Sequence, residues 1–169
     1  MNITMSSRLL DLSHIPSGAS PVSIATIRLS KLLRTHLGDL LLQHGNIGLP
    51  SWRIYTGLAE MGEATQKQLV AHCRMEQSHI SRALAQLETK EKLESRRCDE
   101  DKRARRFRLT PTGQKNYQCL LPIVEGFYSA VDDALTSDEI KHYLNLTERL
   151  AKAAETSAVL DRSTIIKPA

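Results

Sequence analysis

The sequence has few cysteines and no long apolar run. Its three cysteines, Cys73, Cys98 and Cys119, show no CxxC spacing and no histidine partner at metal-ligand spacing. This argues against a disulfide framework and a zinc site and indicates a reducing compartment. No apolar stretch approaches the length of a membrane span, and the first residues lack the features of a secretion signal. We therefore expect a cytoplasmic protein with no membrane partner.

The motifs of common enzyme classes are missing as well. The chain contains no HExxH, no glycine-rich phosphate-binding loop and no nucleophile elbow. The acidic run 99–101 falls in a predicted hairpin tip, without the further ligands that a metal ion requires. We expect no enzyme activity, no catalytic residue, no metal and no cofactor.

Positive charge is concentrated in one segment. The whole chain has 23 basic and 19 acidic residues, a net charge of +4. In residues 92–108, however, basic residues clearly outnumber acidic ones. The basic residues there are Lys92, Arg96, Arg97, Lys102, Arg103, Arg105, Arg106 and Arg108, against Glu94, Asp99, Glu100 and Asp101. Such a stripe attracts polyanions, DNA among them. Taken alone, it could equally be a solvated run of charge at a hairpin.

Apolar periodicity predicts mostly helical structure with one hairpin. Helices are expected over 22–44, from Ser51, from a capping box of Thr65 and Gln68 to His72, over 76–90, from Pro111 and from Ser137. Period-two alternation predicts strands over 93–97 and 105–109. Pro122 should kink its helix, and the residues after Glu155 resemble a frayed tail. The fold class is mainly α with a small β-hairpin (α+β).

Two short helices joined by a three-residue turn precede the hairpin, which is typical of a winged helix-turn-helix. On the second helix, polar side chains lie away from the apolar face: Gln77, Ser78, His79, Ser81, Arg82 and Gln86. Side chains of these types bind base edges and phosphates in the major groove. At the hairpin tip, Arg103 beside Lys102 could enter the minor groove, with Asp101 holding another arginine in place.

These motifs together resemble the MarR family of transcriptional regulators. The resemblance starts at LPSWRIYTGLAEM and continues through TQKQLVAHC and MEQSHISRALAQLETKEKLESRR to DEDKRARRFRLTPTG. It extends more loosely into the flanking helices. It implies a homodimer with interlocked terminal helices and two winged lobes on a pseudo-palindromic operator. By motif position it assigns the polar residues 77–79, 81 and 82 to the major groove and Arg103 to the minor groove; Lys102 and Arg105 complete the expected DNA contacts.

One position departs from the pattern of the family. Relatives usually have a glycine just after the recognition helix, where this chain has Glu91. A left-handed helix end is unfavourable for a residue with a Cβ. The sequence therefore leaves open how this helix ends and at what angle it meets the hairpin.

The resemblance also implies a small-molecule effector, often an aromatic carboxylate. The candidate effector-binding residues are Arg28, Trp52, Arg53 and Tyr55, which combine guanidinium groups with aromatic rings. Core packing is the alternative for Trp52 and Tyr55, and an internal ion pair is the alternative for Arg53. Cys73 and Cys98 raise a second option, a thiol switch.

The expected organisation has four parts: an N-terminal arm (1–21), a helical dimerisation region (22–48 and 112–157), a winged helix-turn-helix lobe that binds DNA (49–111) and a flexible tail (158–169). The expected function is that of a dimeric regulator that binds double-stranded DNA and represses an operator until an effector relieves it. A redox-sensing regulator and a winged-helix module for protein interaction are the alternatives.

Overall fold

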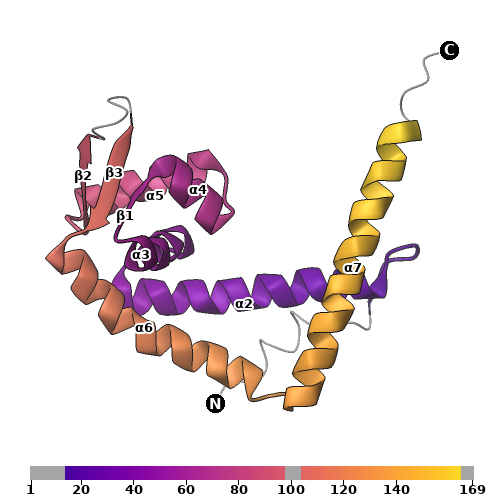
Figure 1. Cartoon of the computed structure of the whole chain (residues 1–169). Helices are drawn as coiled ribbons and strands as arrows, with labels where there is room; N and C mark the ends of the chain where they lie inside the picture. Colours follow the sequence, from indigo (N-terminus) through magenta and orange to yellow (C-terminus); the bar gives the residue numbers. More distant parts are fainter. Residues whose placement is uncertain (1–13, 98–103, 165–169) are drawn as a thin grey trace. The chain divides into compact units, whose positions relative to one another are not determined.

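The computed structural model describes residues 14–97 and 104–164, with side chains described up to residue 156. The chain divides into two compact units, one up to Glu125 and one from Gly126 onward. The elements, shown along the chain in Figure 1, are α2 (Pro21–Gly45), α3 (Leu49–Met61), β1 (Glu63–Thr65), α4 (Gln66–Cys73), α5 (Gln77–Thr89), β2 (Leu93–Arg97), β3 (Arg105–Leu109), α6 (Pro111–Asp132) and α7 (Ser137–Thr164).

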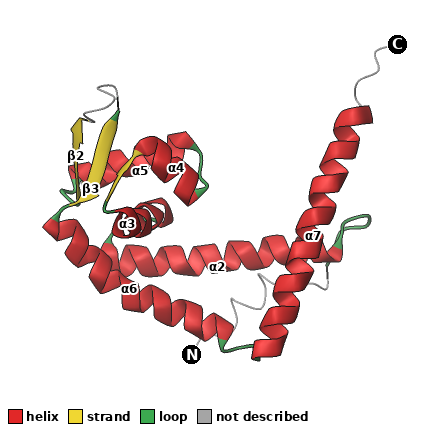
Figure 2. Ribbon diagram, viewed as in Figure 1, coloured by secondary structure: helices red, strands yellow, loops and turns green. Residues whose placement is uncertain are grey.

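The first unit places a small sheet beside three short helices. Colouring by secondary structure separates these strands from α3, α4 and α5 (Figure 2). The sheet is antiparallel with the order β1-β3-β2, and Ala64 and Ser95 flank Phe107 in the register. Both strands of the hairpin have the predicted bounds. β1 was not predicted, because three residues with one apolar side chain show no readable alternation.

The core of this unit is formed by the apolar faces that the periodicity predicted. The largest fully buried side chains are Tyr55, Leu41, Ile54, Leu58, Leu69, Ile80, Leu87 and Leu120. They come from five helices, so burying them holds α2, α3, α4, α5 and the first turns of α6 together. Trp52 stacks on Tyr117 with 5.4 Å between ring centroids, which adds an aromatic contact between α3 and α6.

Local sequence signals set most helix ends. Thr65 and Gln68 form the predicted capping box, each side chain binding the backbone of the other residue. The hydroxyl of Thr110 accepts from the amide of Gly113 at 3.0 Å and caps α6. α3 begins at Leu49, two residues before the predicted Ser51. Proline has no backbone N–H, but the first turn of a helix does not use these groups, so Pro50 fits there.

Of the two later helices, only α7 is longer than the sequence suggested. α6 continues through Pro122 to Asp132. α7 is capped by Thr136 and Glu139, whose side chains bind each other's backbone amides, and it extends to Thr164 rather than ending near Glu155. Within the described part of the chain, no helix combines the length and apolar character needed to cross a membrane.

Candidate nucleic-acid interface

α5 has one buried face and one exposed polar face. Ile80, Ala83, Leu84 and Leu87 are buried, whereas the six predicted polar residues, Gln77, Ser78, His79, Ser81, Arg82 and Gln86, are all exposed. A helix that packs on one side and presents short polar and basic groups on the other can enter a major groove without disturbing its own core.

A tight turn places this helix against α4. Arg74 ends α4 in the left-handed region, with φ +49°, and α5 begins three residues later at Gln77. Cys73 and Leu69 of α4 are buried on the same core as Ile80 of α5. The turn thus produces the predicted helix-turn-helix, with α5 in the position of a recognition helix.

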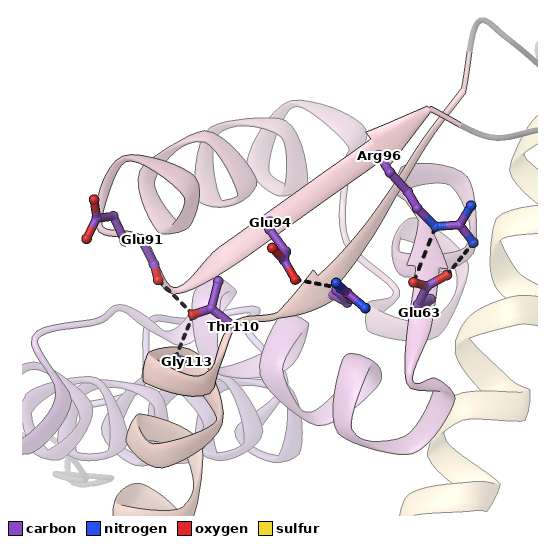
Figure 3. A network of polar contacts seen from close by, with 7 residues as sticks. Glu63, Glu91, Glu94, Arg96, Thr110 and Gly113 are labelled. Carbon is purple, nitrogen blue, oxygen red and sulfur yellow. Dashed lines mark hydrogen bonds and ion pairs between the residues drawn. The ribbon is translucent and has the colours of Figure 1, made fainter.

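Several arginines of the hairpin are paired with carboxylates of the same unit. Arg96 binds Glu63 at 2.9 Å and Arg108 binds Glu94 at 2.6 Å, two pairs that lie close together on the sheet (Figure 3). The hydrogen bond from Arg96 is the main cause that lowers the pKa of the Glu63 carboxyl. These exposed pairs contribute little to stability, but they offset part of the positive charge that the sequence concentrates here.

Arg105, a predicted DNA contact, also binds other residues of the same unit. Its Nη2 lies 2.7 Å from Glu88 Oε1 and donates to the hydroxyl of Ser95, and the guanidinium stacks over Phe107 at 5.2 Å from the ring centroid. The side chain remains about half exposed, at 55%. Arg105 therefore joins the wing to α5 while about half of its side chain stays in contact with solvent. Asp101, Lys102, Arg103 and Cys98 lie outside the described residues.

The recognition helix ends in a left-handed turn at Glu91, whose φ is +54°. The amide of Glu91 donates to the carbonyl of Glu88 at 2.8 Å, and that of Lys92 to the carbonyl of Leu87 at 2.9 Å. This is the double hydrogen bond of a Schellman motif. The helix thus ends as it would with glycine, and Glu91 bears the steric cost of its Cβ.

Two lysines after the recognition helix bind the end of α2. Lys90 Nζ lies 2.7 Å from the carbonyl of Asn46, and Lys92 Nζ lies 2.8 Å from the carbonyl of Gly45. Cations are favoured at a helix C-terminus, where the last carbonyls lack partners. Burial, followed by the charge of Lys90, lowers the pKa of Lys92. The wing and recognition helix are thereby attached to the long helix α2.

Lys92 also enters a polar chain that reaches α3. Its Nζ donates to Asn116 Oδ1 at 2.9 Å, and the same oxygen accepts from the hydroxyl of Tyr55 at 3.1 Å. Burial raises the pKa of the Tyr55 phenol well above its usual range. The sequence did not predict this chain of hydrogen bonds, because the residues that form it lie far apart along the chain.

The structure does not bring the four candidate effector residues together as one exposed site. Trp52 and Tyr55 are 5% and 0% exposed and both contact the ring of Tyr117, so their rings belong to the core. Arg53 donates to the carbonyl of Cys73 at 3.4 Å. Arg28, near the start of α2, donates to the carbonyl of His14 at 3.4 Å.

Cys73, one of the candidate redox residues, is in an unreactive setting. It is buried, its thiol donates to the carbonyl of Arg53 at 3.4 Å, and burial raises its pKa. A raised pKa disfavours the thiolate, which is the reactive form. Cys119 is exposed. Among the described residues, no group of three or more His, Cys, Asp or Glu could hold a metal ion.

Fold and site together define the winged helix-turn-helix class of proteins. Within this class, residues 47–104 match the model of the MarR family, so the chain carries a MarR-family domain, as its motifs suggested.

Solved structures agree with this fold. Sco3205, a MarR family transcriptional regulator from Streptomyces coelicolor in complex with DNA, is 23% identical with a TM-score of 0.72, over 83% of this chain and 94% of that one. PcaV from Streptomyces coelicolor in complex with its natural ligand is 19% identical with a TM-score of 0.67, over 81% and 99%. NadR in complex with 4-hydroxyphenylacetate is 25% identical with a TM-score of 0.61, over 82% and 98%.

Proposed function

We propose that the protein is a dimeric transcriptional regulator that binds a specific DNA sequence. The single observation that carries this proposal is the polar face of α5, exposed beside a tight turn in a MarR-family domain. Gln77, Ser78, His79, Ser81 and Arg82 would meet the major groove. Arg103 would enter the minor groove, with Lys102 and Arg105 on the adjacent backbone and Asp101 supporting the wing.

A second copy of the chain is the proposed partner of the apolar stripe on α7. Tyr143, Leu144, Leu146 and Leu150 are 38–60% exposed, although they follow the helical spacing of a face meant for burial. An exposed apolar stripe on a long helix usually marks a protein interface. In the family that the sequence resembles, terminal helices form the dimer, which supports this assignment.

Repression relieved by an effector is the proposed mode of action. A dimer seated on a pseudo-palindromic operator blocks transcription without further contacts. The NadR structure holds 4-hydroxyphenylacetate, and this supports an aromatic carboxylate as the effector class. Since Trp52 and Tyr55 are core residues, Arg28 and Arg53 are the remaining candidates for binding the carboxylate.

Selection of duplexes from a randomised library by the full-length protein tests the proposal. We expect enrichment of a pseudo-palindrome whose half-sites lie about one helical turn, roughly 10 base pairs, apart. A library that shows no enriched sequence after repeated rounds would contradict sequence-specific binding, and enrichment of a single half-site would contradict the dimer.

A further inference from the structure

A surface hollow of about 240 Å³ lies between the start of α3 and the exposed face of α5. Gly48 and Ser51 line it from α3, and His79, Arg82 and Gln86 line it from α5. The hollow thus adjoins the face proposed to enter the major groove, and no motif in the sequence predicts it.

The first turn of α3 leaves amide groups without partners in the helix. Gly48, the N-cap residue, has no side chain to bind them, and the first hydrogen bond of the helix is the one from the Trp52 amide to the Gly48 carbonyl at 3.1 Å. The amides of Leu49 and Ser51 precede that bond, and Pro50 has none. These donors and the positive end of the helix dipole favour an anion.

Ser51 supplies a second and independent sign of a ligand. The residue is only 4% exposed, and its hydroxyl makes no hydrogen bond within the part of the chain that the structure describes. No described side-chain polar atom is sealed from solvent without a partner, so the Ser51 oxygen keeps some contact with solvent, and Ser51 is one of the residues that line the hollow. Buried hydroxyls are normally paired, and this one is without a partner among the described residues, in a residue that lines the hollow.

Arg82 brings positive charge to the same place. Its Nε donates to the carbonyl of Ser78 at 3.3 Å, which uses one of the five N–H groups of the guanidinium, and the residue lines the hollow. His79 and Gln86 add polar groups one turn to either side. A hydroxyl, helix-end amides and a guanidinium are together a set of donors suited to an oxyanion.

We propose that this hollow binds one phosphate of the DNA backbone, with Ser51 and the first turn of α3 as donors and Arg82 as the charged partner. The inference rests on the proposed function. Phosphates border the major groove, and contacts to them set the register of a recognition helix. Arg82 then holds the backbone, which leaves Ser81 and Gln77 for the base edges.

The first test is the change Ser51→Ala, measured on a duplex selected by the wild-type protein. We expect about tenfold weaker binding, because a hydrogen bond to a charged oxygen is lost. The melting temperature should stay the same or rise, since the lost hydroxyl has no partner in the free protein. Ser30→Ala, which removes an exposed hydroxyl from α2, is the matched control and should bind as the wild type does. Unchanged affinity in Ser51→Ala would overturn the proposal.

Duplexes with single neutral methylphosphonates identify the bound group. At one position in each half-site, the neutral linkage should weaken DNA binding by the wild type. The same linkage should cause no further loss of affinity in Ser51→Ala. If the wild type binds the duplex but no position behaves so, the phosphate site is wrong while the proposed function stands. If the wild type binds no selected duplex, the proposed function itself fails.

Inorganic phosphate distinguishes a free oxyanion from a backbone phosphate. In a titration of the full chain without DNA, followed by the amide resonances of Ser51 and Trp52, the proposal expects weak binding that Ser51→Ala removes. Tight binding of free phosphate that releases the duplex would instead assign the hollow to a small effector, and would overturn the proposal.

Discussion

The hydroxyl of Thr110 donates a hydrogen bond to the carbonyl oxygen of Glu91, 2.7 Å away. The same hydroxyl accepts from the amide of Gly113 at 3.0 Å (Figure 3). One side chain therefore connects the residue that ends the recognition helix to the first turn of α6. A change in the direction of α6 would therefore change the position of the residue that ends α5.

Glu91→Gly should stabilise the protein. The left-handed φ of +54° costs a residue with a Cβ roughly 1 kcal/mol, and glycine removes that cost while keeping the Schellman hydrogen bonds. The free energy of unfolding should rise by about 1 kcal/mol, which corresponds to about 2–4 °C in melting temperature. Glu91→Ala keeps the Cβ and should show no gain; an equal gain in both variants would contradict the steric explanation.

Gly113→Ala should be among the most damaging changes to the winged unit. A Cβ at this position would collide with the carbonyl oxygen of Lys92, so the start of α6 and the turn after α5 would have to separate. We expect a loss of at least about 3 kcal/mol in the free energy of unfolding, measured with urea. Gly126→Ala, where nothing lies within 4 Å of the added Cβ, is the control and should be neutral or stabilising. Similar losses in the two variants would contradict the proposed collision.

Tyr55 should make the fold sensitive to alkaline pH. Burial raises the pKa of its phenol above the usual value of 10.0, so above about pH 10 the unfolded chain releases a proton that the folded chain keeps. The contribution of Tyr55 to the unfolding free energy must then fall as pH rises. Tyr55→Phe should flatten this fall between pH 9 and 11, at a cost of about 1 kcal/mol below pH 9 for the lost bond to Asn116.

The matched control for this change is Tyr128→Phe, since Tyr128 is exposed at 49%. It should follow the wild-type curve across the whole range. A fall of equal steepness in the wild type and in Tyr55→Phe would show that another group dominates.

Leu150→Lys should separate the proposed dimer. Leu150 is 46% exposed in the single chain, so lysine is tolerated by the fold, but in a dimer interface it would bury an unpaired charge. Light scattering at micromolar concentration should give the mass of a monomer. Asn145→Lys, on the opposite side of α7 by helical spacing, adds the same charge and should leave the dimer intact. If Leu150→Lys remains a dimer, the interface lies elsewhere.

Local signals in the sequence predicted the elements that position the site. Alternation around Phe107 gave the hairpin, and the Thr65 capping box gave the start of α4. The buried face of α5 followed from the spacing of Ile80, Leu84 and Leu87. These patterns are readable because each residue interacts mainly with neighbours along its own element.

Features that depend on distant partners could not be predicted. Glu63 and Arg96 are 33 residues apart, so neither β1 nor the ion pair across the sheet has a local signature. The sequence shows Glu91 at a position where glycine is usual. It does not show whether the left-handed turn is kept with a residue that has a Cβ or whether the helix ends in another way. The burial of Ser51 depends on how α5 packs against α3, and for that reason its hydroxyl was not recognised as a candidate contact.

The salt dependence of DNA affinity tests the central claim, that α5 and the wing read two grooves, most directly. The dissociation constants of the wild type, Arg103→Ala and Ser81→Ala are measured from low to high salt on the selected palindrome and on an unrelated duplex. Arg103→Ala should weaken binding and make its salt dependence shallower, whereas Ser81→Ala should lose about 1–3 kcal/mol of discrimination between the duplexes. Equal affinities and equal salt slopes for all three proteins would contradict the account.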